Sequence, residues 1–514
     1  LLAETEALWQ NRCSSLEVVT PDKALNHYLG FWGQYQVQAS RMLSRTSVYQ
    51  CGGAYGFRDQ LQDCCALFQS NPALAREHIL RCCRHQFTEG DVLHWWHEIP
   101  GGGADAGVRT RMTDDLLWLP YTLSVWWEET GDTELLGRQE PYLAGERLGQ
   151  EEKDRYFAPV FSEARESVYR HGIRAVECVL GRGVGAHGLC KMGGGDWNDG
   201  MDKVGSAGRG ESVWLTWFTV LVLRRFATVC EAMNEPDRAG RYRSTAGILS
   251  ESAQQCWDGA WFLRGYFDSG APLGGSSCPE CQIDSISQSF AALACGDQPR
   301  VRQALEHAQA LLMDEESGTV ALLDPPFDGK GPDPGYIADY RPGNRENGGQ
   351  YTHAAVWLAL AWFQLGEADQ GWSILRTLLP EHHPMERYRA EPFVLAADVS
   401  RERGKEGAAG WSWYTGAAGW YWRVAVRELL GIRFRGGLLY LEPNLPSEWP
   451  GYRAAFGLDG GRLEIEVAYG VENRMFLDGC EVSQGISLSG LKGRHSLRLE
   501  ILRKRGCATE GNHV

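Results

Sequence analysis

Between about residue 24 and residue 430, apolar residues recur at three- to four-residue spacing in some twelve segments. This spacing places apolar side chains on one face of an α-helix, and clusters of Gly, Pro and Asp separate the segments. We therefore predict about twelve helices, which in pairs suit a double ring. The clearest segments are residues 114–129, 162–180, 211–233, 285–295, 301–314, 351–365 and 411–430.

After about Ile432 the apolar spacing changes to two residues, as in residues 462–467 and 496–501. Alternation of this kind is typical of strands with one buried face. We therefore predict a mainly α protein with three parts. Residues 1–23 form a linker or helical remnant, residues 24–431 a helical barrel, and residues 432–514 a small β-sheet domain.

Four long loops rich in Gly, Trp, His and Pro interrupt the helical pattern, at residues 89–111, 181–210, 265–284 and 325–350. Loops of this length inside a compact domain usually carry function. We therefore expect the site among them.

The chain carries 51 Lys and Arg against 66 Asp and Glu, a net charge of -15. This balance disfavours nucleic acid or an anionic membrane as the main partner. Its richest apolar run, residues 354–363, is shorter than the roughly 20 residues that a membrane span needs. A neutral or small ligand is the better expectation, and we predict no membrane segment.

The chain begins at Leu1 with neither an initiating Met nor a signal sequence, so we expect a fragment of a larger polypeptide. Its 15 Cys, an odd number, are scattered as neighbours and singletons, which favours reduced thiols and a cytoplasmic location. Cys278 and Cys281 form a lone CxxC pair. Because a structural zinc site needs a second pair at short spacing, we predict no metal.

The glycine-rich loop at residues 193–200 places Asp196, Trp197 and Asp199 close together. A carboxyl group beside an aromatic face has its pKa raised by desolvation, as a general acid for a glycosidic oxygen requires. The loop therefore indicates carbohydrate chemistry. The alternative is a turn rich in Asx residues with a packed Trp.

Four further runs pair charged residues with aromatics. They are residues 49–63 preceded by Arg45, residues 94–97 with 109–115, residues 341–353, and residues 411–416. With the glycine-rich loop, in this order and over nearly the whole chain, they resemble the inverting phosphorylases of glycoside hydrolase family 94. Residues 49–63 and 345–355 are most similar to the branch acting on β-1,2-glucans, which includes oligoglucan phosphorylases and modules of cyclic β-1,2-glucan synthases.

The resemblance implies an (α/α)6 barrel with β-rich domains around it, and a homodimer. Members carry a large β-sandwich before the barrel. Only about twenty residues precede the first predicted barrel helix here, which again indicates a fragment.

The resemblance also implies inverting phosphorolysis of a β-linked gluco-oligosaccharide, giving α-glucose 1-phosphate. Asp199 would be the general acid, and inorganic phosphate would be the co-substrate, with no cofactor. Because phosphate is already anionic, no catalytic base is needed. The resemblance assigns the anion to Arg45, His353, Thr415 and Gly416, residue types that match a tetrahedral oxyanion.

We predict sugar contacts for residues that stack on rings or exchange hydrogen bonds with hydroxyls. They are Arg58, Asp63, Asp196, Trp197, Arg345 and Glu346, with Asp59 as a competitor for Asp63. Five further residues are weaker candidates for an acceptor-side cleft: His94, Trp95, Trp96, His97 and Arg109.

Structural alternatives remain for several of these residues. Arg58 and an Asp can form a buried bridge, Arg45 a surface ion pair, and His353 and Trp197 part of the core. Two alternatives remain for the whole chain. One is an inverting hydrolase in which Glu346 or Asp63 activates water, and the other is a non-catalytic or length-controlling glycan-binding module of a larger synthase. Neither linkage nor chain length of the glycan follows from these residues.

Overall fold

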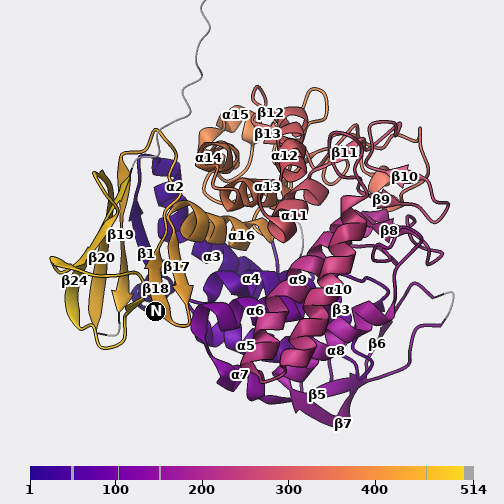
Figure 1. Cartoon of the computed structure of the whole chain (residues 1–514), viewed down its shortest axis with the longest axis horizontal. Helices are drawn as coiled ribbons and strands as arrows, with labels where there is room; N and C mark the ends of the chain where they lie inside the picture. Colours follow the sequence, from indigo (N-terminus) through magenta and orange to yellow (C-terminus); the bar gives the residue numbers. More distant parts are fainter. Residues whose placement is uncertain (48–50, 102, 150–151, 459, 503–514) are drawn as a thin grey trace, which may run out of the picture.

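The computed structural model describes residues 1–47, 51–101, 103–149, 152–458 and 460–502. Within these ranges, six helices contact one another in sequence and close into an inner ring (Figure 1). They are α4 (Phe57–Cys64), α6 (Asp115–Thr130), α9 (Val213–Ala232), α11 (Ser285–Cys295), α13 (Thr352–Gln364) and α16 (Ala417–Arg423), which continues through π-type turns over Val424–Leu429. The last, α16, packs on α4 and completes the ring.

A second layer packs one helical segment against each inner helix. The pairs are α4 with α5 (Pro72–Cys83), α6 with α8 (Val168–Gly181), α9 with α10 (Pro236–Gln254), α11 with α12 (Pro299–Leu312), α13 with α14 (Ala368–Thr377), and α16 with the segment at residues 23–43, which includes α2 (Lys23–His27) and α3 (Gly33–Tyr35). Most side chains of the inner helices are buried, as in α13, where every side chain from Thr352 to Phe363 is buried. Helix α4 differs because it also buries polar side chains, among them Arg58 and Asp63. The predicted (α/α)6 barrel is confirmed.

Local sequence sets most of the helix boundaries. Asp22, Ser167, Ser212 and Asp284 each accept a hydrogen bond from a backbone N–H in the first turn of the helix that follows. Gly131 ends α6 with a φ of 69°, the left-handed conformation that glycine adopts without strain.

Two predicted helices begin later than their patterns indicated. Residues 160–167 form strand β7 (Val160–Ser167), which pairs with β5 (Gln139–Ala144) before α8 starts. Residues 411–416 form a loop, and α16 begins at Ala417. In both cases tertiary contacts override an apolar spacing that also fits a helix.

The region after Ile432 folds as the predicted β domain. One sheet has the order β1-β19-β20-β24-β21-β22 and a second has β17-β18-β23. Their strands are β17 (Ile432–Arg435), β18 (Leu438–Leu441), β19 (Gly451–Leu458), β20 (Gly461–Gly470), β21 (Arg474–Leu477), β22 (Cys480–Glu481), β23 (Ile486–Ser487) and β24 (Gly493–Leu502). The end of the predicted domain, residues 503–514, lies outside the described residues.

The N-terminal residues are more than a linker. Helix α1 (Leu2–Cys13) precedes β1 (Leu16–Val19), whose residues pair with β19 from Leu16 opposite Phe456 to Val19 opposite Arg453. Residues 16–19 therefore complete the C-terminal sheet. Four residues are too short a pattern to predict a strand whose partner lies at the other end of the chain.

Short strands organise the loops at the mouth of the barrel. One sheet joins β2 (Tyr55–Gly56), β3 (Leu93–His97), β4 (Ala106–Thr110) and β6 (Asp154–Phe157), and another joins β8 (Glu211–Ser212), β9 (Gly265–Tyr266) and β10 (Pro272–Leu273). Three strand pairs complete the set: β11 (Ile283–Asp284) with β14 (Leu323–Asp324), β12 (Met313–Asp314) with β13 (Thr319–Val320), and β15 (Gln350–Tyr351) with β16 (Asp398–Val399).

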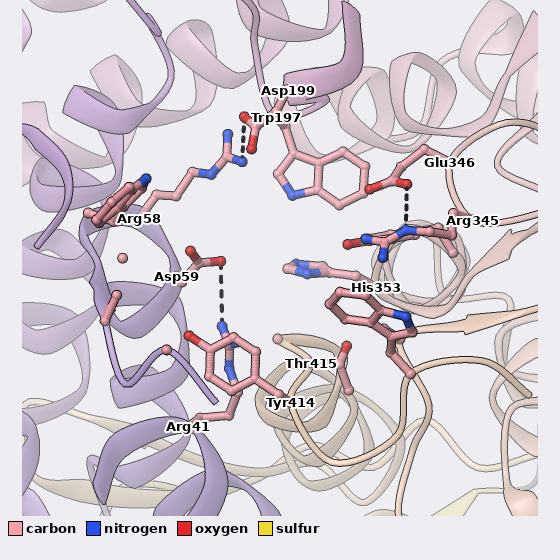
Figure 2. A pocket seen from close by; sticks show the side chains of 18 of the residues that line it. Arg41, Arg58, Asp59, Trp197, Asp199, Arg345, Glu346, His353, Tyr414 and Thr415 are labelled. Carbon is pink, nitrogen blue, oxygen red and sulfur yellow. Dashed lines mark hydrogen bonds and ion pairs between the residues drawn. The ribbon is translucent and has the colours of Figure 1, made fainter. Parts of the chain in front are cut away.

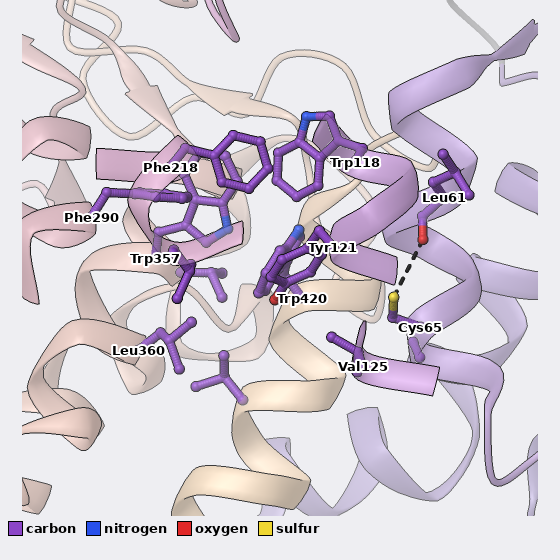
Figure 3. Close-up of a cluster of buried hydrophobic side chains, with 14 of the residues drawn as sticks. Leu61, Cys65, Trp118, Tyr121, Val125, Phe218, Phe290, Trp357, Leu360 and Trp420 are labelled. Atoms are coloured by element: carbon purple, nitrogen blue, oxygen red, sulfur yellow. Dashed lines mark hydrogen bonds between the residues drawn. The ribbon is translucent and has the colours of Figure 1, made fainter. Parts of the chain in front are cut away.

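Large aromatic side chains fill the centre of the inner ring (Figure 3). Trp357 on α13 lies 4.8 Å from Phe290 of α11, 5.7 Å from Trp420 of α16 and 6.3 Å from Trp118 of α6, measured between ring centroids. It lies 6.3 Å from Trp214 of α9. One indole therefore joins five of the six inner helices.

Helix α9 is the one helix in the described ranges that is long and apolar enough to cross a membrane. In the barrel, 83% of its apolar window is buried. Its composition follows from its place in the inner ring.

We expect Trp357→Ala to destabilise the barrel by about 3–5 kcal/mol, because it removes a fully buried indole and leaves a cavity. Trp357→Phe should cost clearly less. Urea unfolding followed by far-UV circular dichroism measures both. An Ala variant as stable as the wild type would show that the aromatic centre does not hold the ring.

Candidate active site

A cavity of about 430 Å³ opens at the end of the barrel where the long loops meet. Side chains from α4, the glycine-rich loop, the segment before β15 and the loop before α16 line it (Figure 2). Eight of the predicted site residues line it: Arg58, Trp197, Asp199, Arg345, Glu346, His353, Thr415 and Gly416. The structure therefore brings most of the predicted site residues together in one cavity, and the role of each residue remains a prediction.

Asp199 begins a single 3₁₀ turn, Asp199–Met201, and its carboxylate lies at the cavity wall. Oδ1 accepts a hydrogen bond from Arg58 Nη2 at 2.8 Å, and Oδ2 lies 3.9 Å from His94 Nε2. Burial raises the pKa of Asp199 above its ordinary value, although Arg58 and His94 oppose the shift. The geometry gives a carboxyl group that holds its proton to a higher pH than a surface Asp.

Behind Asp199 lies a buried charge network that the sequence pattern did not reveal. Arg58 Nη1 donates to Asp114 Oδ2 at 3.2 Å, and His94 Nδ1 lies 2.8 Å from Asp115 Oδ2. Burial lowers the pKa of His94, but the Asp115 carboxylate outweighs burial and brings the pKa to about 9. His94 and Arg58 are therefore both cations at neutral pH, and they fix the position of the Asp199 carboxyl.

The opposite side of the cavity gathers polar side chains that can donate hydrogen bonds. His353 points into the cavity and lies close to Gly416, where an added Cβ would come within 3.0 Å of the imidazole ring. Thr415 and Tyr414 stand beside it, and the guanidinium of Arg41 lies 4.1 Å from the centre of the Tyr414 ring.

Two buried side-chain nitrogens in this group have no hydrogen-bond partner among the described residues. They are Arg41 Nη2, which is 3.5 Å from Asp59 Oδ1 in a looser ion pair, and His353 Nε2. Burial and the positive charge of Arg41 lower the pKa of His353 to about 3, so its ring is neutral at physiological pH. A buried donor without an acceptor is costly, and an anion in the cavity would relieve that cost.

Arg41 takes the place that the sequence gave to Arg45. The Arg45 guanidinium donates to the carbonyls of Gly53 and Leu43, stacks on Tyr55 and forms an ion pair with Glu98. It does not line the cavity. The prediction of Arg45 as a phosphate ligand is therefore not supported by this geometry. The two arginines are four residues apart, and the spacing alone did not distinguish them.

Asp63 likewise lies away from the cavity, fully buried, with Oδ2 accepting from Arg41 Nε at 2.7 Å. Asp59, one helical turn earlier on α4, lines the cavity instead. Its pKa is lowered: burial would raise it, but Arg41 and Arg58 outweigh burial. Asp59, the competitor weighed from the sequence, therefore replaces Asp63 as the carboxylate that can accept from sugar hydroxyls.

Asp196 is also a supporting residue rather than a cavity residue. Its two carboxylate oxygens accept from Arg264 Nη1 and Nη2, each at 2.6 Å, and both side chains are fully buried. Ser212 Oγ donates to Asp196 Oδ2 at 2.7 Å. The pair therefore anchors the glycine-rich loop to strands β8 and β9.

Trp197, Arg345 and Glu346 line the third wall. Trp197 packs edge-on against His353 and Tyr351, and its ring lies 4.9 Å from that of Trp357 beneath it. Arg345 Nε donates to Glu346 Oε2 at 3.3 Å, and the Arg345 guanidinium lies 4.4 Å from the ring centre of Trp411. Trp197 therefore packs against the core and lines the cavity as well.

Several cavity residues were not predicted: Arg41, Tyr336, Tyr340, Tyr351, Trp411 and Tyr414. The tyrosines lie in or beside the runs at residues 341–353 and 411–416. Their closeness in sequence to glycines and charged residues is the feature from which they could have been predicted. Of the acceptor-side candidates, Trp95 and His97 line the cavity. Trp96 is buried in the core, and Arg109 is held by Asp91 at 2.7 Å.

Comparison with known families agrees with the fold and the motifs. The glycosyl hydrolase 94 superfamily catalytic domain matches residues 8–431, and the glycosyl hydrolase family 65 C-terminal domain matches residues 432–471. The chain belongs to the glycosyl hydrolase 94 superfamily.

Two curated relatives to which the chain is similar differ in their named functions, one a synthase and the other a phosphorylase. The cyclic beta-(1,2)-glucan synthase NdvB of Rhizobium meliloti is 42% identical over 91% of this chain, which covers 17% of that protein. The 3-O-beta-D-glucopyranosyl-beta-D-glucuronide phosphorylase of Paenibacillus borealis is 30% identical over 88% of the chain and 56% of its own length. The chain therefore spans a part of each relative.

Solved structures share the fold. A family 78 rhamnosidase of Bacillus sp. GL1 superposes with a TM-score of 0.59 at 11% identity, over 95% of this chain and 44% of that one. A family 63 mannosylglycerate hydrolase of Thermus thermophilus gives 0.50 at 10% identity, over 76% and 98%. In the described residues, no group of three or more His, Cys, Asp or Glu side chains is arranged to hold a metal ion.

We expect Asp196→Ala to destabilise the fold by about 3–5 kcal/mol, because the substitution leaves the buried Arg264 cation without its bidentate partner. Asp199→Asn, at the cavity wall on the same loop, should change stability by less than about 1 kcal/mol, because the amide keeps the shape of the side chain and an oxygen that can accept from Arg58. Chemical denaturation of the two variants provides the comparison. Equal stabilities would contradict the anchoring role of Asp196.

Proposed function

We propose that this chain catalyses inverting phosphorolysis of a β-1,2-linked gluco-oligosaccharide and releases α-glucose 1-phosphate. The observation that carries the proposal is the facing arrangement in one cavity. A carboxyl group of raised pKa stands on one side, and the buried nitrogens of Arg41 and His353, which have no hydrogen-bond partner among the described residues, stand on the other. Superfamily membership and the phosphorylases among the relatives support the reaction class.

In this mechanism the Asp199 carboxyl donates its proton to the glycosidic oxygen as the bond to the anomeric carbon breaks. Phosphate, held by Arg41, His353, Thr415 and the Gly416 backbone, attacks that carbon from the opposite face. The anomeric configuration therefore inverts. The C–O bond to the leaving sugar is replaced by a C–O bond to phosphate, and the proton ends on the leaving hydroxyl.

The donor glucose would lie between these two groups. Asp59, ionised at neutral pH, accepts from its hydroxyls, and the Arg345–Glu346 pair offers further donors and acceptors. Trp197 supplies an aromatic wall for the apolar face of the ring. The β-1,2 linkage is proposed from the motifs and from the similarity to the glucan synthase.

An inverting hydrolase is the second candidate, because carboxylates besides Asp199 line the cavity. Asp63 lies away from the cavity and cannot activate water there. Burial raises the pKa of Glu346, although Arg345 opposes the shift, and this direction does not disqualify Glu346 as a base. The buried side-chain nitrogens of Arg41 and His353, however, suit an anion better than a neutral water. Phosphorolysis is therefore the better supported reaction.

The third alternative is a non-catalytic module. It does not explain why a carboxyl group of raised pKa faces a group of buried polar nitrogens across one cavity. A cytoplasmic location and a homodimer remain predictions.

The decisive experiment incubates the protein with β-1,2-gluco-oligosaccharides, cellobiose or chitobiose, with and without inorganic phosphate, and assays sugar 1-phosphate and free sugar. We expect α-glucose 1-phosphate from the β-1,2 series only when phosphate is present. The Asp199→Asn variant should lose at least about 10³-fold in kcat, because its amide cannot donate the proton at neutral pH. The wild-type rate should fall as the pH rises and Asp199 loses its proton, with a midpoint above the ordinary range of an Asp. Equal sugar release without phosphate would indicate hydrolysis instead.

His353→Ala should raise the KM for phosphate by about tenfold or more, because one neutral N–H donor to the anion is lost, while the KM for the glycan changes by less than about threefold. His353→Gln, which keeps an N–H, should recover part of the loss. Because the His353 ring is already neutral, the phosphate KM of the free enzyme should show no inflection near pH 6.5 from this residue. A larger effect on the glycan KM than on the phosphate KM would place His353 in the sugar site.

A further inference from the structure

The sheet β2-β3-β4-β6 carries a row of side chains that leads from the cavity to the edge of the molecule. Gly56 pairs with Trp95, Trp95 with Val108, and Val108 with Tyr156. Paired residues in adjacent strands point to the same face, at about 4.8 Å per strand step. The row therefore spans about 14 Å, which is longer than one sugar ring.

The neighbouring row points the other way. Tyr55, Trp96, Gly107 and Phe157 pair in the same register, with Tyr55 stacked on Trp96 at 5.5 Å and Phe157 facing Phe87 at 6.1 Å. This face packs toward the core, so strand alternation turns Trp95 and Tyr156 outward. The outward aromatics are thus fixed by the register of four strands.

The two outward rings form a continuous shelf. Gly56 and Trp95 line the cavity, and Tyr156 is 55% exposed. The ring centroids of Trp95 and Tyr156 lie 5.6 Å apart at 39°, although their strands are separated by β4. The rings therefore lean over Val108, which is 9% exposed. Large exposed aromatics that join a binding cavity mark a surface with a function.

The shelf begins on the side of the cavity that holds the general acid. Trp95 follows His94, whose Nε2 lies 3.9 Å from Asp199 Oδ2. In the proposed reaction the leaving sugar stands on the Asp199 side, whereas phosphate stands on the side of His353. A chain that continues beyond the leaving sugar therefore meets Trp95 first and Tyr156 next.

We propose that Trp95 and Tyr156 form a distal subsite that binds the acceptor end of a gluco-oligosaccharide, two or more sugar units beyond the bond that is cleaved. This inference rests on the proposed function and extends it to chain length. The shelf offers aromatic faces, which suit the apolar faces of neutral sugar rings. Arg155, the cation next to Tyr156 on β6, already donates to Glu152 and Glu146 at 2.5 and 2.7 Å, so it is not free to bind an anion. A neutral glycan therefore fits this surface better than an ionic ligand.

The test measures kcat/KM for β-1,2-gluco-oligosaccharides from the disaccharide to the heptasaccharide. In Tyr156→Ala, the ratio of the value for the longest substrate to that for the shortest should fall about three- to tenfold, as expected for the loss of one aromatic contact. Tyr156→Phe keeps the ring and should keep the ratio. Phe161→Ala is the matched control, because Phe161 is an exposed strand aromatic, 42% exposed, on β7 and outside the shelf.

An unchanged ratio in Tyr156→Ala, or an equal fall in Phe161→Ala, would overturn the proposal. A halving of the mass of Tyr156→Ala in analytical ultracentrifugation would also overturn it, because Tyr156 would then belong to a subunit interface. Binding of the same oligosaccharides to Asp199→Asn, measured by calorimetry without phosphate, separates this inference from the proposed reaction. Loss of length-dependent affinity in Asp199→Asn/Tyr156→Ala would support the subsite even if the wild type proved to be a hydrolase. Length-independent affinity in Asp199→Asn would refute it.

Discussion

The packing of Trp357 at the centre of the inner ring is the interaction on which the rest of the structure depends. Its indole contacts aromatic side chains of α6, α9, α11 and α16, so one side chain on α13 holds five helices at fixed separations. The same ring supports Trp197 at 4.9 Å and His353 at 4.4 Å, both of which reach the cavity. The core and the floor of the site are therefore packed together, and the close packing of the barrel limits the movement of the side chains at the cavity floor.

Charge pairing decides which polar residues reach the cavity and which support them. Buried cations need partners, and Arg58 and Arg41 are each shared between carboxylates. Arg58 joins Asp114 to Asp199, and Arg41 joins Asp63 to Asp59. In each pair one carboxylate is fully buried and the other lines the cavity. This division keeps Asp199 in place while its burial favours the protonated form.

The sequence predicts the fold better than it predicts the site, for a physical reason. Helix periodicity is local, so the barrel helices and the strand domain follow from spacing alone. Asp59 and Asp63 lie on the same face of α4, one turn apart, so the choice between them depends on where along the helix the cavity begins. The choice between Arg41 and Arg45 depends on where the helical segment at residues 23–43 ends. Both are set by packing against distant helices. Asp196 and Asp199 share one loop, but they differ in their partners. Asp196 is held away from the cavity because it pairs with Arg264, which lies far along the chain, directly before β9.

The pairing of β1 with β19 is a second contact, besides the packing of α16, that joins the first and last parts of the chain. The helical segment at residues 23–43 and α16 already meet at the seam where the first and last barrel elements join, and β1 fastens the same two regions of chain outside the barrel. Such contacts join residues far apart in sequence, so closing the chain between them costs more conformational entropy than a local contact does. In a nascent chain that has not yet reached residue 451, Leu16 and Val18 lack β19, the strand that pairs with them. The pairing between the two ends of the chain can form only after β19 has been synthesised.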